Sequence, residues 1–240
     1  MKLAIMQPYF LPYVGYFQLI NSVDKWVVFD SIQYIRRGWV NRNRILSPNI
    51  EKQWQYISVP IIAQKRNAFI NHTIINNEIN WHAEIFGKLT YYKQIGAPYY
   101  SDVTQLVQKS FDHKFKYLSH LNIELLRSIC QYLDIPFDYS ICSEQDYDFS
   151  EVNGAGDWAL EIARQSNADE YINPVGGHSL FNRERFNDAG IRLSFLSTSD
   201  FEYHQSKREF VSSLSILDIM MFNSKSQIQS ILTNNTKISS

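Results

Sequence analysis

The run RRGWVNRNR at residues 36–44 gathers the side chains best suited to bind an anion. Guanidinium groups bind phosphate or carboxylate in a bidentate manner, and asparagine amides add hydrogen bonds to sugar hydroxyls. A tryptophan ring would stack on a ligand ring or on one of the arginines. A solvated, charged loop is the alternative interpretation. The substrate-binding candidates in this run are Arg37, Trp39, Asn41, Arg42 and Asn43.

A second candidate is the proline- and aromatic-rich run MQPYFLPYVGY at residues 6–16, which supplies Gln7, Tyr9 and Tyr16. Its two prolines fix the backbone, and Gly15 permits a close approach to a neighbour. The run loosely resembles the loop of nucleotidylyltransferases, in which a Gly-His pair follows the turn. Gly15 is followed here by tyrosine, which disfavours that chemistry but leaves an aromatic clamp for a base or sugar.

Three side chains are candidates for proton transfer: Asp30, His82 and His178. Asp30 lies at the end of a predicted strand, together with the binding candidates Gln33 and Tyr34. Histidine is the usual acid–base group near neutral pH, although a single histidine is more often structural. No metal-ligand spacing and no phosphate-binding glycine motif occurs, so the sequence predicts neither a metal nor a cofactor.

Composition and charge narrow the class of protein. The formal net charge is −1 and 45% of the residues are hydrophobic, which is typical of a folded protein without a basic face for nucleic acid. No apolar run has the roughly 20 residues needed to span a membrane. Two cysteines fit a reduced compartment, so we expect a cytoplasmic protein. The 15 Tyr, 15 Phe and 5 Trp are compatible with a homodimer but do not require one.

The N-terminal pattern predicts a strand at 2–7, a helix at 13–24 and a second strand at 25–34. This βαβ unit favours a parallel sheet. Short extended pieces between residues 38 and 75 predict a small β-rich insertion. The fold class is therefore α/β, a Rossmann-like, mainly parallel sheet with flanking helices.

The remaining elements follow from hydrophobic spacing, and we expect a single domain over residues 1–228 with a frayed tail at 229–240. Ser101 is the expected N-cap of one helix, and Pro136 follows the end of the strongest one. The predicted helices are 80–95, 101–111, 117–133, 154–168 and 212–224, and the predicted strands are 137–144, 169–181 and 190–197.

The block from AIMQPYFLPYVGY to RRGWVNRNRI, together with SVP, WH at 81–82, YYKQIGAPYY and SILD at 215–218, resembles the WbqC-like family. Members are often encoded in bacterial clusters for O-antigen and other surface polysaccharides. The resemblance implies a cytoplasmic role in making or decorating a sugar precursor. The family's polar signature falls on Gln7, Tyr9, Gly15, Tyr16, Asp24, Asp30, Gln33, Tyr34, Arg37, Trp39, Asn41, Arg42, Asn43 and His82.

The leading hypothesis is a transferase that modifies a nucleotide-linked amino sugar by acyl or aminoacyl transfer. Arg37 and Arg42 would hold a diphosphate, Trp39 or Tyr9 would stack on a ring, and Asp30 or His82 would accept a proton. The partners would be the nucleotide-linked sugar and an acyl or aminoacyl donor or carrier protein. Two alternatives stay open, a nucleotidylyltransferase-like enzyme and a non-catalytic scaffold in the same pathway.

Overall fold

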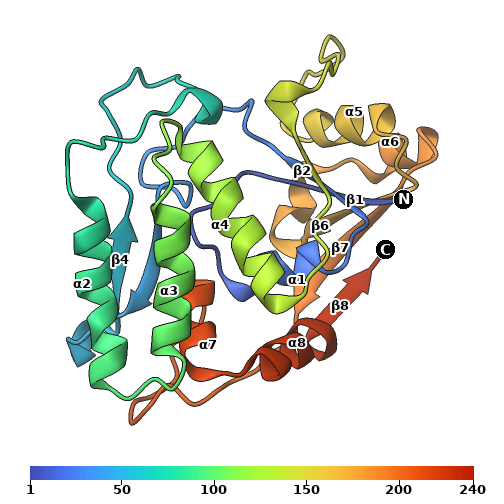
Figure 1. The fold of residues 1–240 in the computed structure, drawn as a ribbon. Helices are drawn as coiled ribbons and strands as arrows, with labels where there is room; N and C mark the ends of the chain where they lie inside the picture. The colour runs from blue at the N-terminus through green and yellow to red at the C-terminus, as the bar shows by residue number, and fades with distance from the viewer.

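The computed structural model describes residues 1–240 and contains a six-stranded sheet with helices on both faces (Figure 1). The strands lie in the order β5-β2-β1-β6-β7-β8. The first five pair in parallel, and β8 pairs antiparallel with β7. In chain order, the strands of this sheet are β1 (Lys2–Met6), β2 (Lys25–Val28), β5 (Tyr139–Ile141), β6 (Glu170–Pro174), β7 (Arg192–Thr198) and β8 (Thr236–Ser239).

The predicted βαβ start is confirmed, since α1 (Val14–Ile20) connects β1 to its parallel neighbour β2. β2 ends at Val28, earlier than the predicted Tyr34, because the chain leaves the sheet there. After Val28 the chain no longer follows the sheet, and the N–H of Tyr34 donates to the carbonyl of Ala68, which lies outside the six-stranded sheet.

Alternation along the strands gives the sheet two buried faces. Ala4, Trp26 and Val28 belong to the larger core, which also includes the apolar sides of α1, α4 (Leu118–Leu133) and α8 (Lys225–Asn234). Leu3 and Val27, one residue away, belong to a smaller core with α5 (Asp157–Gln165) and α6 (Arg183–Asp188). The arrangement is a mixed α/β fold with helices on both sides of a mostly parallel sheet.

A separate antiparallel pair, β3 (Arg42–Leu46) and β4 (Trp54–Ser58), lies beside the helix α2 (Trp81–Gln94) (Figure 1). α2 in turn packs against α3 (Tyr100–Phe111). The register places Arg44 opposite Tyr56. The last part of the predicted insertion, at 59–75, is mostly irregular, with a short 3-10 turn at Ile70–His72 and isolated bridges. α7 (Ile216–Phe222) packs against β3 and α3.

The leucine-rich helix predicted at 117–133 is confirmed as α4, and its apolar stripe is buried. Asp134 ends it in the left-handed conformation, ahead of Pro136. Its polar Asn122 is also fully buried, which the stripe pattern did not predict. None of the helices combines the length and the apolar character needed to cross a membrane.

Two expectations about helix ends are wrong. Ser101 lies inside α3, whose N-cap is Tyr99. The expected frayed tail at 229–240 instead contains the end of α8 and the strand β8. A capping box between Ser224 and Gln227 starts α8, whose Ile228 and Leu232 are buried.

Candidate functional site

Strands β1 and β6 are neighbours, but the chain leaves them toward opposite edges of the sheet, through α1 to β2 and through α6 to β7. Ligands of open parallel sheets bind at the carboxyl ends of strands where the connections part in this way. A cavity of about 570 Å³ lies there. We call it the central cavity, and its lining residues are Met6, Tyr9, Tyr13, Trp39, Asn43, Arg44, Asn173, Pro174, Gly176, Gly177, Leu180 and Ser213.

Arg44 is the one charged side chain in the lining of the central cavity. Its guanidinium carbon lies 5.3 Å from the ring centre of Trp39 and 5.1 Å from that of Trp54. One terminal nitrogen donates to the carbonyl of Ser213 at 3.2 Å, and Nε is buried without a hydrogen-bond partner in the chain. An arginine whose guanidinium packs against two rings and is held by one hydrogen bond can bind an anion through its remaining terminal N–H groups.

Asn43 does not point free amide groups into the cavity, as the sequence-based prediction required. Its Nδ2 donates to the carbonyls of Phe10 and Leu11 at 3.1 and 3.0 Å, and its Oδ1 accepts from the N–H of Arg44 at 2.8 Å. Leu11 has φ 46°, a conformation that costs a non-glycine residue about 1–3 kcal/mol. Asn43 and Ser215, whose Oγ donates to the same Leu11 carbonyl, therefore hold a strained loop in place.

Side chains from two helices form hydrogen bonds to the start of the loop that contains Leu11. Nδ2 of Asn122 on α4 donates to the carbonyls of Pro8 and Val40, each at 2.7 Å. The hydroxyl of Tyr16 on α1 donates to the carbonyl of Gln7 at 2.8 Å. Tyr16 is thus a buried positioning residue, and Gln7 contributes its backbone, while neither side chain lines the central cavity.

Tyr9 and Tyr13 are the side chains that this fixed loop presents to the central cavity. Burial raises the pKa of both hydroxyls, and for Tyr9 the neighbouring Tyr13 adds to the effect. Both phenols are therefore neutral near pH 7. Neither hydroxyl has a hydrogen-bond partner in the chain, so both can bond to a ligand.

The opposite wall comes from the turn after β6, in which Gly177 passes close to Asn173. A Cβ on Gly177 would lie 2.3 Å from Nδ2 of Asn173, so any other residue would displace that amide. Asn173 is engaged by Tyr171, whose hydroxyl donates to its Oδ1 at 2.9 Å. His178 follows directly and packs on Phe195 with ring centres 4.6 Å apart. It is the predicted proton-transfer residue closest in the chain to the cavity lining.

A smaller cavity of about 250 Å³, the side cavity, adjoins the central one and shares Tyr13 and Ser213 with it. Thr198, at the end of β7, and Tyr203 are among its lining residues. A Cβ on Gly15 would lie 2.4 Å from Cε2 of Tyr13 and 3.3 Å from Oγ1 of Thr198. Gly15 therefore fixes the position of the ring that separates the two cavities.

The remaining arginine candidates gather elsewhere. A third cavity, of about 390 Å³, is called the arginine cavity. Its lining includes the binding candidates Tyr34, Arg37, Asn41 and Arg42, and also Arg36, which was not a candidate. None of these residues lines the central cavity. The predicted binding residues that line a cavity are thus divided between two. Tyr9, Trp39 and Asn43 line the central cavity. Another four, Tyr34, Arg37, Asn41 and Arg42, line the arginine cavity. Gln33 lines neither cavity and donates to the carbonyl of Arg66 at 2.9 Å.

Two of the predicted catalytic residues lie apart from all three cavities. The carboxylate of Asp30 accepts from the N–H and hydroxyl of Ser143, at 2.9 and 2.7 Å, and so joins the ends of β2 and β5. His82 on α2 stacks on Phe111 with ring centres 4.9 Å apart. Burial lowers the pKa of His82, and the charge of Asp112 opposes that effect.

Sequence reasoning did not select Tyr13, Arg44 or Ser213 as site residues. Arg44 was visible in the arginine run, and its spacing of two from Arg42 is the signal that both project from one face of a strand. Tyr13 belonged to the aromatic loop but was not distinguished from its neighbours. Ser213 carries no sequence signal, because its place depends on the fold of the C-terminal segment.

Comparison of the sequence with known protein families shows the family to which the chain belongs. The sequence profile of the WbqC-like protein family matches residues 7–230. The chain belongs to the WbqC-like family. An uncharacterized protein of Mycobacterium tuberculosis, Rv1507c, is 28% identical over 222 residues, which cover 91% of this WbqC-like chain and 92% of that protein. No solved structure matches the chain significantly.

Proposed function

We propose that this WbqC-like protein is a transferase that modifies a nucleotide-linked sugar, bound in the central cavity. The observation that carries the proposal is Arg44, the one charged side chain in the cavity lining, whose guanidinium packs against two indole rings. A volume of about 570 Å³ is within the usual range for small-ligand sites. The strand order supports a Rossmann-like assignment, in which such ligands bind where the strand connections part.

Each part of the ligand has a matching group in the cavity. Arg44 would bind the phosphates, and the ring of Trp39 would stack on the base or the sugar. The free hydroxyls of Tyr9 and Tyr13 would bond to sugar hydroxyls. Asn43 would act only by holding the loop that carries the two tyrosines.

The finer proposal is acyl or aminoacyl transfer to an amino sugar in surface-polysaccharide synthesis, the setting that the family resemblance implies. The amine nitrogen attacks the acyl carbon, a C–N bond forms, and the bond from that carbon to the donor's leaving group breaks. A base must take the proton that the amine loses. His178 is our candidate, because its loop supplies Gly176, Gly177 and Leu180 to the cavity.

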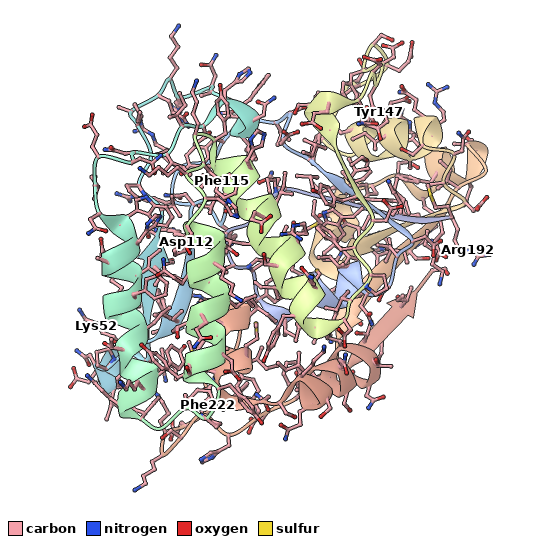
Figure 2. The ribbon with its side chains drawn as sticks, in the orientation of Figure 1. Lys52, Asp112, Phe115, Tyr147, Arg192 and Phe222 are labelled. Carbon is pink, nitrogen blue, oxygen red and sulfur yellow. The ribbon has the colours of Figure 1, made fainter.

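The test is calorimetric titration with UDP-, GDP- and dTDP-linked sugars, including amino sugars. We expect Arg44→Met to weaken binding of the active ligand by roughly ten- to a hundredfold, because charge-assisted hydrogen bonds are lost. Arg192→Met is the matched control, because Arg192 does not line the central cavity. It begins β7, at the other end of the strand from Thr198, and lies at the edge of the molecule (Figure 2). Equal losses in both variants, or no binding by any of these ligands, would refute the proposal.

Gly15→Ala tests the position of Tyr13. The added methyl group displaces the Tyr13 ring, so we expect about tenfold weaker binding of the same ligand. The melting temperature should change little, because the Tyr13 side chain is only partly buried, with 37% of its surface exposed, and can move. Gly87→Ala is the control, since its Cβ meets nothing within 4 Å in the middle of α2, where alanine favours the helix. Unchanged affinity in Gly15→Ala would show that the Tyr13 ring does not contact the ligand.

A binding protein without catalytic activity is the second candidate. No carboxylate or imidazole lines the central cavity, which favours binding alone. Under this alternative His178→Ala binds the sugar nucleotide normally and neither form turns it over. Nucleotidylyl transfer, the other alternative, predicts instead that a nucleoside triphosphate binds with magnesium.

A further inference from the structure

The positive charge of the chain is concentrated in one segment. Residues 31–77 contain seven Lys and Arg and a single acid, Glu51. The segment thus carries +6, and the rest of this chain of net charge −1 carries −7. None of its seven basic side chains forms an ion pair, since all the salt bridges of the structure lie elsewhere. Such uncompensated cations attract an anionic ligand.

Three of these cations converge on the arginine cavity, which has no acidic residue in its lining. Arg42 is held by stacking, its guanidinium carbon 4.1 Å from the ring centre of Tyr56, and it donates to the carbonyl of Arg37. Its Nε is buried without a partner in the chain, as is that of Arg44 in the central cavity. Arg36 and Arg37 are exposed and make no side-chain hydrogen bond within the chain.

A neutral donor completes the set. Tyr34 is 5% exposed, and its hydroxyl has no hydrogen-bond partner in the chain. Burial raises its pKa, while the charges of Arg42 and Arg36 act in the opposite direction. The phenol is therefore protonated and close to both guanidinium groups. Three guanidinium groups and a phenol can supply hydrogen bonds to all the peripheral oxygens of a phosphoryl group.

We propose that the arginine cavity is a second, separate anion site that binds the phosphoryl group of the co-substrate. Arg42 and Arg44 are two residues apart on one face of β3, roughly 7 Å along the strand, and each serves its own cavity. The site would therefore hold the group donor beside the sugar nucleotide. The role as a co-substrate site rests on the proposed function, whereas the anion site itself does not.

The test uses inorganic pyrophosphate as the probe, titrated calorimetrically into the full chain at low ionic strength. We expect the double variant Arg36→Met/Arg37→Met to bind pyrophosphate about tenfold more weakly or worse, because both exposed guanidinium groups are lost. The matched control is Lys65→Met/Arg66→Met. It removes the same charge from the same basic segment but from residues that do not line the cavity. It should retain the affinity within about threefold.

Equal losses in the two double variants would mean diffuse attraction, and would overturn the site. Unchanged pyrophosphate binding in Arg36→Met/Arg37→Met would overturn it as well. If that variant weakens sugar-nucleotide binding as much as Arg44→Met does, the two cavities form one site and the separation is wrong. If pyrophosphate binding depends on Arg36 and Arg37 while no sugar nucleotide binds, the second site stands and the proposed function fails.

Discussion

Replacing Asn43 by aspartate is expected to lower the free energy of unfolding by about 4 kcal/mol. The change puts a carboxylate oxygen where Nδ2 now donates to the carbonyls of Phe10 and Leu11. Two buried carbonyls lose their donor and face a negative charge at a residue that is 3% exposed. Because Leu11 is held in a strained conformation, the loop would also lose one of its two restraints, the hydroxyl of Ser215 being the other. Urea unfolding followed by tryptophan fluorescence measures the effect.

Asn41→Asp is the matched control for this prediction. Asn41 lies two residues earlier, is half-buried, and donates only one hydrogen bond, to the carbonyl of Val59 at 3.0 Å. The same chemical change should cost at most about 1 kcal/mol there, because the arginines that line the same cavity attract a carboxylate. The loss in Asn43→Asp should also shrink at low pH, where a protonated carboxyl can donate to one of the two carbonyls. Equal losses in the two variants would show that Asn43 does not hold the loop.

The elements that sequence predicts well are those with strong local periodicity. The leucine stripe of α4 and the βαβ start through α1 depend on spacing within one segment, so they could be read without tertiary information. The pairing of β8 with β7 could not, because Thr236–Ser239 has no apolar alternation and is a strand only through its neighbour.

The candidate site was predicted as a set of residues but not as a geometry. The arginine run and the aromatic loop both contribute residues to cavities, and their role in binding stays a prediction. Arg44 lines the central cavity and Arg42 lines the arginine cavity because of how β3 pairs with β4 and where the loop at 7–13 lies. No local sequence pattern predicts this division. Asn122 had a readable signal, a polar residue within an apolar stripe, and it is fully buried on the loop carbonyls.

Asp218 supports the wall of the side cavity through a buried hydrogen-bond network. Its Oδ1 accepts from the hydroxyl of Tyr92, and its Oδ2 accepts from the hydroxyl of Tyr203 and from Nε2 of Gln205, all within 2.6–2.7 Å. Tyr203 lines the side cavity. Burial raises the pKa of Asp218 to about 6, although these hydrogen bonds and the charge of Arg208 act in the opposite direction.

The raised pKa of Asp218 determines how its contribution to the free energy of unfolding changes with pH. Since the folded pKa of about 6 exceeds the ordinary value of 3.8, the folded state binds the proton more tightly than the unfolded state. The stabilising contribution of Asp218 is therefore complete below pH 3.8 and is lost as the pH rises through 6. This difference between the folded and unfolded pKa corresponds to about 3 kcal/mol in the free energy of unfolding.

Asp218→Asn isolates this contribution, because asparagine does not titrate. Within the range from pH 4 to 8, the wild-type chain should exceed the variant in unfolding free energy by the largest margin at pH 4. The margin should shrink by about 2.5 kcal/mol by pH 8. The variant itself is destabilised, since an amide NH₂ takes the place of one of the two oxygens that accept from Tyr92, Tyr203 and Gln205. Asp157 and Asp169, whose pKa values are lowered, contribute with the opposite sign, but they are common to both proteins and cancel in the difference. Urea unfolding of both chains from pH 4 to 8 measures the margin, and a margin independent of pH would mean that Asp218 ionises in the folded chain as it does in water.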